Sequence, residues 1–319
     1  MSCAIIIPAI KKNKLLENCI EKCLKQKKVK VHIYVILDIL NTKKKNYKNV
    51  TFIKSSKNIS AKRNLGVKIA KEKYIAFIDS DAYPEKNWVF ESIKNLKKNK
   101  KIGLVTGCDV AYPNESGTAK VVALVNKSKF TSGTKSFRKN LKSKSRFVNH
   151  ASSCNMVLEK KFYDRIGGMN EDIYVGEDIA FCNKLTKYKK IFFTNKSIIY
   201  HKTRSLIPFI LQRFTYGTAV TSSYKNFSFN KNFEFFIPSL IILTLIFTAL
   251  FYPDYLKMNL IIYFLISFFI LIESIKIAGL KSSFMVYLLN IISILSFGIG
   301  TLLSLFLSIK KIKKIYTKR

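Results

Sequence analysis

The sequence predicts an α/β domain followed by a membrane region. Residues 74–78 form a short apolar run of the kind that becomes a buried strand, and the stretch from Ala61 just upstream opens a helix. Near Phe233 a lysine-rich, mixed pattern gives way to long apolar runs. Since 319 residues exceed one typical domain, we expect one domain at 1–230 and a second part at 233–309.

Two carboxylates follow the predicted strand at 74–78. Asp79 and Asp81 emerge from its carboxyl end, where open α/β sheets bind their ligands. Mg²⁺ and Mn²⁺ take oxygen ligands and share their shell with water and substrate phosphates, so one or two protein carboxylates are enough. The pair therefore predicts a divalent metal that holds a diphosphate. An Asp-x-Asp pair alone is common, and the alternative is a solvated turn.

The surroundings of this pair resemble the nucleotide-sugar region of the family 2 glycosyltransferases, a large inverting group with a GT-A fold. The residues that carry the resemblance are Ala61, Lys62, Arg63, Asn64 and Gly66, then Asp79 and Asp81, then Pro84 and Trp88. The resemblance implies a Rossmann-like mixed sheet flanked by helices, a nucleotide-sugar donor with a UDP-sugar favoured, and Mn²⁺ or Mg²⁺ as cofactor. It also implies that Arg63 and Asn64 bind substrate.

The first two predicted strands look like those of the same family. Residues 4–10 look like its first strand, whose end, with Pro8, lies under the base and ribose. Residues 31–38 look like its second strand, with Asp38 where the family contacts the nucleobase. Family members often carry two acidic residues and a small polar one here, whereas this chain continues Ile-Leu-Asn at 39–41, so the nucleobase stays open.

Residues 150–185 resemble the acceptor side of the same domain. In that family a Gly-Glu-Asp element, here at 176–178, begins a helix beside the sugar, and its Asp is the catalytic base. The resemblance thus makes Asp178 the base and lets Glu177 contact the acceptor. Inversion requires the acceptor hydroxyl to attack opposite the leaving diphosphate while a base removes its proton. The alternative for both carboxylates is capping of the helix, and the two roles can coexist.

His201 follows an apolar strand at 197–200. Many members of the family have a histidine at about this place, so the resemblance implies that His201 joins Asp79 and Asp81 in the metal shell or contacts the diphosphate. The alternative is a structural histidine with its hydrogen bonds satisfied inside the fold.

The stretch at 206–220 has apolar residues at helical spacing, with Gln212 and Arg213 between them. In membrane-attached members of the family a comparable amphipathic segment, here 205–225, lies along the bilayer surface beneath the active site. Gln212 and Arg213 are therefore candidate substrate-binding residues, and Arg213 could meet the diphosphate of a donor or a lipid acceptor. The alternative is an ordinary helix that faces a core.

Long apolar stretches predict a multi-pass protein of the cell membrane, at the inner or plasma membrane. They lie at 235–252, 260–280 and 284–309, and they approach or exceed the roughly twenty residues that span a bilayer. We expect two to four membrane segments in the region 233–309. Soluble core helices would need a much larger partner surface than the chain provides.

The distribution of charge predicts how the protein sits in the membrane. The lysine-rich first part has no secretory signal peptide, and sugar nucleotides are cytosolic, so the catalytic domain should be cytoplasmic. Three simple spans would place the basic tail at 310–319 on the other side, against the positive-inside rule. Either one apolar segment is interfacial, or the last one bends back.

The net charge of +37 raises the question of nucleic acid. The lysines are scattered through the chain instead of gathering in a recognised nucleic-acid module, and the apolar stretches place the surface beside anionic lipid. We therefore expect membrane lipids and no nucleic acid as partners.

The function predicted is metal-dependent, inverting transfer of a sugar from a nucleotide-sugar donor to a lipid-linked or polyprenyl-phosphate acceptor, in cell-envelope glycan biosynthesis. One alternative is a processive polysaccharide synthase, although the Gln-x-x-Arg-Trp element of such enzymes is only partly echoed by Gln212, Arg213 and Phe214. The other is a non-catalytic membrane scaffold with the same fold, against which the intact Asp79, Asp81 and Asp178 argue.

Overall fold

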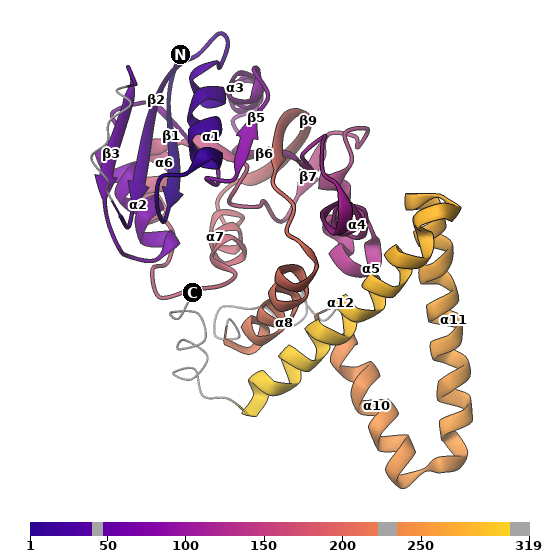
Figure 1. Cartoon of the computed structure of the whole chain (residues 1–319). Coiled ribbons are helices and arrows are strands. Elements are labelled where there is room, and N and C mark those ends of the chain that lie inside the picture. The colour runs from indigo at the N-terminus through magenta and orange to yellow at the C-terminus, as the bar shows by residue number, and fades with distance from the viewer. Residues whose placement is uncertain (40–46, 223–234, 307–319) are drawn as a thin grey trace. The chain divides into compact units, whose positions relative to one another are not determined.

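The computed structural model describes residues 1–39, 47–222 and 235–306 (Figure 1). The chain divides into two compact units, and each is considered by itself. An α/β unit comprises Met1–Pro113 and Arg138–Lys202, and a helical unit comprises Asn114–Phe137 and Thr203–Arg319. Residues 114–137, which lie inside the predicted domain at 1–230, thus group with the C-terminal helices. The basic tail at 310–319 lies outside the described residues.

The α/β unit is built on a mixed sheet with the strand order β3-β2-β1-β4-β8-β6-β9-β5, and β7 also pairs with β9. The strands are β1 (Ser2–Ala9), β2 (Lys30–Leu37), β3 (Val50–Lys54), β4 (Tyr74–Phe77), β5 (Ala82–Pro84), β6 (Ile102–Ala111), β7 (Arg146–Val148), β8 (Met156–Glu159) and β9 (Lys190–His201). The first four strands are mutually parallel, so their carboxyl ends share one edge of the sheet. The antiparallel β8 separates β4 from β6.

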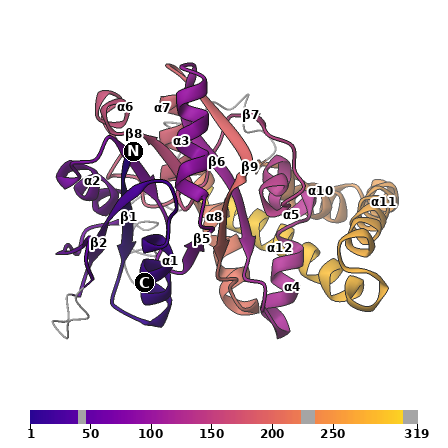
Figure 2. The same cartoon turned by 90° about the horizontal axis from the view of Figure 1, so that it is seen from above.

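Helices cover both faces of this sheet (Figures 1 and 2). They are α1 (Lys14–Leu24), α2 (Ile59–Ile69), α3 (Trp88–Lys98), α6 (Lys160–Arg165) and α7 (Glu177–Leu185). Residues of α1 and α3 belong to one buried cluster, and residues of α2, α6 and α7 belong to the other. Alternate residues of β1 enter the two clusters, Ile5 and Ile7 the first and Ala4 and Ile6 the second. The continuous apolar runs in the sequence reflect this burial on both faces.

Local signals account for the helices beside the predicted donor region. Asn13 and Asn58 are the N-caps of α1 and α2, and their side chains accept hydrogen bonds from the backbone N–H of Leu16 and Ala61. Gly66 lets α2 lie close to the sheet, because a Cβ at this position would be 2.5 Å from the side chain of Ile6. The predicted strand at 74–78 corresponds to β4, and the predicted mixed sheet flanked by helices is confirmed.

The helical unit combines a short middle segment with the C-terminal helices. Its elements are α4 (Gly117–Val125), α5 (Lys129–Ser132), most of the 3₁₀ helix η1 (Gly133–Lys139), α8 (Leu206–Ser222), α10 (Ile237–Phe251), α11 (Pro253–Ala278) and α12 (Leu280–Phe306). Helices α8 and α12 pack backbone against backbone. A Cβ on Gly217 would lie 2.1 Å from the carbonyl oxygen of Phe297, and one on Gly300 would lie 2.2 Å from that of Phe214.

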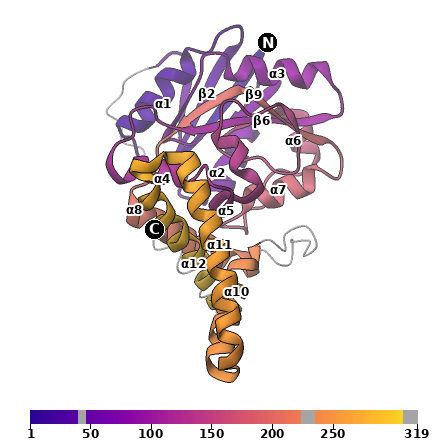
Figure 3. The same ribbon diagram turned by 90° about the vertical axis from the view of Figure 1, so that its right-hand side faces the viewer.

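Two helices of this unit, α11 and α12, are long and apolar enough to cross a membrane, by length and composition (Figure 3). They have 26 and 27 residues, and an 18-residue window of each has a mean hydropathy of 2.3 and 2.0 respectively, whereas α10 has 15 residues. Only 11% of the most apolar window of α11 is buried inside the protein. The predicted amphipathic segment at 205–225 forms α8 as far as Ser222, and its last residues lie outside the described part of the chain.

Candidate active site

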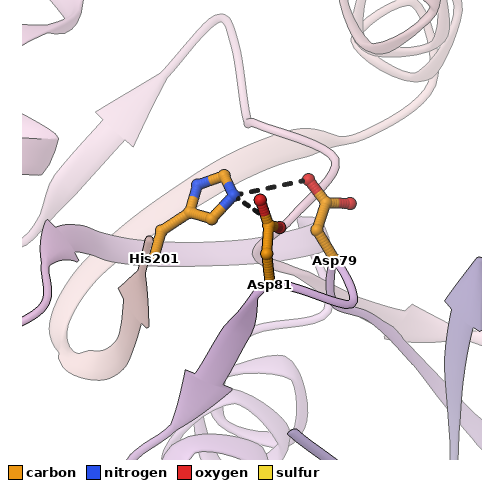
Figure 4. Close-up of side chains that lie close together, drawn as sticks. All are labelled: Asp79, Asp81 and His201. Atoms are coloured by element: carbon orange, nitrogen blue, oxygen red, sulfur yellow. Dashed lines mark hydrogen bonds and ion pairs between the residues drawn. The ribbon is translucent and has the colours of Figure 1, made fainter. Parts of the chain in front are cut away.

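The acidic pair predicted from the sequence lies at the edge of the sheet where β4 ends. Asp79 and Asp81 occupy the short connection from β4 to β5, and His201 is the last residue of β9. Strand β5 runs antiparallel to β9 with Ala82 opposite His201, and this register brings Asp81 beside the imidazole. The Nε2 atom of His201 is 3.0 Å from Oδ1 of Asp81 and 4.0 Å from Oδ2 of Asp79 (Figure 4).

These three side chains fit a divalent cation. Each offers one ligand atom, and the three atoms lie within 4.8 Å of one another. Carboxylate oxygen and imidazole nitrogen are donors that Mn²⁺ accepts, and the carboxylates also suit Mg²⁺. Burial opposes a charge on His201, yet hydrogen bonds to Asp81 and Cys154 hold its pKa well above the usual value. The predicted metal ligands are thus brought together in space.

Arg63 connects this acidic pair to the predicted acceptor side. It lies on α2, is fully buried, and donates from Nη2 to Oδ1 of Asp79 at 2.9 Å and from Nη1 to Oε1 of Glu177 at 3.0 Å. Burial alone would disfavour the guanidinium charge, but Asp79 and Glu177 outweigh it and raise the pKa of Arg63. The arginine therefore fixes two carboxylates that lie far apart in the sequence.

The predicted nucleoside-binding residues meet at the ends of β1 and β2. Pro8 is buried in β1, and Asp38 follows β2 directly. Lys62 of α2 lies between them: its Nζ is 2.6 Å from Oδ1 of Asp38 and donates to the carbonyl oxygen of Ala9 at 2.8 Å. The sequence motif contained Lys62 without predicting this role, because nothing local indicates which carboxylate the lysine will reach.

The side chain of Asn64 forms its hydrogen bonds within the protein. Its amide nitrogen donates to the carbonyl oxygen of Met169 and to Oε1 of Glu171, each at 2.9 Å. Its amide oxygen accepts from the hydroxyl of Tyr163 and from the backbone N–H of Met169. The side chain therefore holds α2 to the turn after α6, and its contact with substrate stays a prediction.

Glu177 and Asp178 form the first turn of α7, after Gly176, which adopts a left-handed conformation with φ of 81°. Oδ1 of Asp178 accepts from the backbone N–H of Ile179 at 2.8 Å, which is the capping role considered above. Burial and the neighbouring charge of Asp178 raise the pKa of Glu177, while Arg63 opposes that shift. Capping thus uses one oxygen of Asp178.

Two residues that sequence reasoning did not assign, His150 and Arg138, form a row that ends at Asp178. Nε2 of His150 is 3.4 Å from Oδ2 of Asp178, and Nη1 of Arg138 is 3.2 Å from Nδ1 of His150. His150 opens the stretch at 150–185 that carries the family resemblance, which is a weak signal. Arg138 lies in a lysine-rich stretch with no recognisable motif, so no pattern could have identified it.

Gln212 and Arg213 belong to α8 of the helical unit. Gln212 donates to the hydroxyl of Tyr216 at 2.7 Å, and Nη2 of Arg213 donates to the carbonyl oxygen of Thr131 at 2.7 Å. The guanidinium of Arg213 also lies over the ring of Phe297, 5.4 Å from its centroid. Burial lowers the pKa of Arg213 to about 10. Substrate binding by Gln212 and Arg213, and the contact of Arg213 with a diphosphate, stay predictions.

Comparison with known proteins identifies one family and one curated relative. The glycosyl transferase family 2 profile matches residues 4–167. A poly(ribitol-phosphate) beta-glucosyltransferase of Bacillus spizizenii is 36% identical over 96 residues, which cover 26% of this chain and 15% of that protein. The chain thus matches only a small part of this relative.

Two solved structures are similar to parts of the chain. S. aureus TarS covers 68% of it with 16% identity and a TM-score of 0.45, and the match covers 39% of TarS. A structure of GalNAc-T7 with UDP, GalNAc and Mn²⁺ covers 64% of it with 14% identity and a TM-score of 0.49, and the match covers 43% of that chain.

Proposed function

The chain belongs to glycosyl transferase family 2 and has the GT-A fold, and from this we propose that it is a metal-dependent, inverting glycosyltransferase. It transfers a sugar from a nucleotide-sugar donor, with a UDP-sugar favoured, to a lipid-linked or polyprenyl-phosphate acceptor. The observation that carries the proposal is the double contact of Arg63, which holds Asp79 and Glu177 in one polar network. In the proposal, the diphosphate and its cation lie at Asp79, next to the second pair of carboxylates formed by Glu177 and Asp178, as transfer between two substrates requires.

In this proposal the donor lies across the carboxyl ends of β1, β2 and β4. Asp38 and Lys62 contact the nucleoside, and Asp79, Asp81 and His201 would hold Mn²⁺ or Mg²⁺ where the diphosphate binds. When bound, the cation neutralises negative charge on the leaving nucleoside diphosphate. Arg63 holds Asp79 in place, because its guanidinium donates directly to that carboxylate.

Asp178 deprotonates the acceptor in the same proposal. As the acceptor hydroxyl attacks the anomeric carbon, its proton passes to Asp178, the new glycosidic bond forms, and the bond to the diphosphate breaks on the opposite face. Configuration at that carbon is inverted. Glu177 remains held by Arg63 and by the hydroxyl of Ser153, so the base of this step is Asp178 and not Glu177.

The acceptor is proposed to carry phosphate and to lie at a membrane. The net charge of +37 favours an anionic partner, and α11 and α12 are long and apolar enough to anchor the chain. The curated relative is named for a glucosyl transfer to poly(ribitol-phosphate), which is also phosphate-bearing. We propose a multi-pass protein of the cell membrane with its catalytic unit in the cytoplasm, acting in cell-envelope glycan synthesis.

The test is release of nucleoside diphosphate from a panel of sugar nucleotides, with Mn²⁺ or Mg²⁺ and a lipid extract. Asp178→Asn should lower the lipid-stimulated rate by about 10²- to 10⁴-fold, because it removes the base. Asp164→Asn is the matched control, since that carboxylate is exposed on α6 and pairs with Lys160. Chelation of the cation should abolish release by every active variant.

Two results would contradict the proposal. Wild-type protein that binds nucleotide but releases no diphosphate from any donor would support a scaffold instead. Full activity of Asp178→Asn would reject that residue as the base, while leaving the transferase assignment intact.

A further inference from the structure

Three side chains of the α/β unit stand in a row that ends at Asp178. Nη1 of Arg138 is 3.2 Å from Nδ1 of His150, and Nε2 of His150 is 3.4 Å from Oδ2 of Asp178. Arg138 is 8% exposed, and the side chains of His150 and Asp178 are 14% and 21% exposed. The row therefore leads from the protein interior to the proposed base.

The first contact determines which nitrogen of His150 carries the proton. A guanidinium only donates hydrogen bonds, so Nδ1 of His150 must be the acceptor and must lack a proton. A neutral imidazole then carries its proton on Nε2, which faces Asp178.

This arrangement matters for the proposed base because it restricts the orientation of the Asp178 carboxylate. Oδ1 of Asp178 accepts from the backbone N–H of Ile179, and Oδ2 lies 3.4 Å from Nε2 of His150, which is within ion-pair distance but lacks the geometry of a hydrogen bond. The hydrogen bond from Ile179 and the proximity of the His150 ring limit the orientations that the carboxylate can take. His150 itself has no free lone pair in this tautomer, so it does not compete as a base.

We propose that Arg138 and His150 are positioning residues, which hold the base Asp178 in its reactive orientation through a His150 ring protonated on Nε2. The inference rests on the proposed function, since it assigns a role relative to Asp178. Misplacement of a reacting group by about 1 Å can lower the rate about 10²-fold. Loss of the Nε2–H group of His150 should therefore lower the rate of transfer measurably.

A pair of substitutions at His150 separates positioning from folding. The amide nitrogen of Gln can stand where Nε2 stands, whereas Asn reaches only the position of Nδ1. His150→Asn should lower kcat about 10- to 100-fold without changing the donor KM, and His150→Gln should recover roughly tenfold of that loss. Equal kcat values for the two variants, or a loss expressed mainly in the donor KM, would overturn the inference.

A second measurement needs no turnover. The chain has three histidines, so the ring nitrogens can be assigned by ¹⁵N NMR of histidine-labelled full-length protein in micelles. At pH 8 we expect Nδ1 of His150 to be unprotonated and Nε2 to be protonated, and we expect Arg138→Met to lose this tautomer preference. A proton on Nδ1 of His150 in the wild type would overturn the inference.

These measurements distinguish the inference from the proposed function. If the wild type releases diphosphate normally but the two His150 variants behave alike, only the inference fails. If the wild type releases none from any donor, the proposed function fails, and the positioning role falls with it even where the tautomer is as expected.

Discussion

The α/β unit and the helical unit each contain an arginine that the sequence marked as a binding residue, and the two have opposite surroundings. Arg63 is fully buried between the carboxylates of Asp79 and Glu177, which raise its pKa. Arg213 donates to a backbone carbonyl oxygen and lies over Phe297, and burial lowers its pKa to about 10. Within the described part of the helical unit, no carboxylate forms an ion pair with Arg213.

The difference indicates two uses of a positive charge. Arg63 forms its ion pairs within the protein, with Asp79 and Glu177, and thereby fixes the positions of these two carboxylates. The charge of Arg213 is not balanced by a described neighbour in its own unit, which suits a residue that meets an anionic ligand. An arginine in a sequence motif can therefore organise a site without touching the substrate.

The largest expected effect is on Arg63. Arg63→Met leaves the partly buried carboxylates of Asp79 and Glu177 without their shared cation, and this should lower the free energy of unfolding by about 3–5 kcal/mol. Denaturant unfolding of the purified protein measures this change in the free energy of unfolding. Arg63→Lys retains the charge but not the two-pronged geometry and should lose less. A loss below about 1 kcal/mol for Arg63→Met would show that the two carboxylates do not depend on the arginine.

An intermediate effect is expected at Asn290, the buried amide of the helical unit. Asn290 lies on α12, accepts from the hydroxyl of Thr131 at 2.5 Å and donates to Ser274 of α11 at 3.4 Å. Asn290→Leu should therefore cost about 1–2 kcal/mol, because the hydroxyl of Thr131 loses its partner. Thermal unfolding in micelles measures the change.

The control for this substitution is Leu288→Ala, at a residue of the same helix that is 43% exposed. It should change the stability by no more than about 0.5 kcal/mol in micelles. Equal effects of the two substitutions would mean that the polar contact does not join the middle segment to α12.

Apart from the control at Leu288, the smallest expected effect on stability is that of Arg213→Met. The substitution removes a guanidinium whose charge is disfavoured by burial, so the free energy of unfolding should change by less than about 1 kcal/mol, in contrast to Arg63→Met. The lipid-stimulated rate should nevertheless fall roughly tenfold, since the contact with a diphosphate predicted from the sequence would be a charge-assisted hydrogen bond. If Arg213→Met lost as much stability as Arg63→Met and left the rate unchanged, Arg213 would be a structural residue and not one that binds an anion.

Parts of the site could be predicted because their signals are local. An apolar run followed directly by Asp79 and Asp81 places two carboxylates at the end of β4, whatever else the chain does. The Gly-Glu-Asp element likewise places Asp178 in the first turn of α7. The family resemblance and the mixed sheet with flanking helices are both confirmed.

Other parts depend on contacts between distant segments. The tie from Lys62 to Asp38 follows from how α2 packs on β1 and β2, and the contact of His150 with Asp178 follows from how α7 packs beside the loop before β8. Asn64 is a further example. The family motif predicts that it binds substrate, whereas in the structure both the nitrogen and the oxygen of its amide form hydrogen bonds within the protein.

By itself the sequence determined the fold class, the family, the two acidic elements and the presence of long apolar helices, because each is encoded by neighbouring residues or by periodicity along one segment. Only the tertiary structure decided that Arg63 joins Asp79 to Glu177, that Arg138 and His150 lead to Asp178, and that residues 114–137 group with the C-terminal helices. Hydrogen bonds and ion pairs of this kind are specified by angstrom-scale packing between distant elements, and residue order alone does not contain those distances.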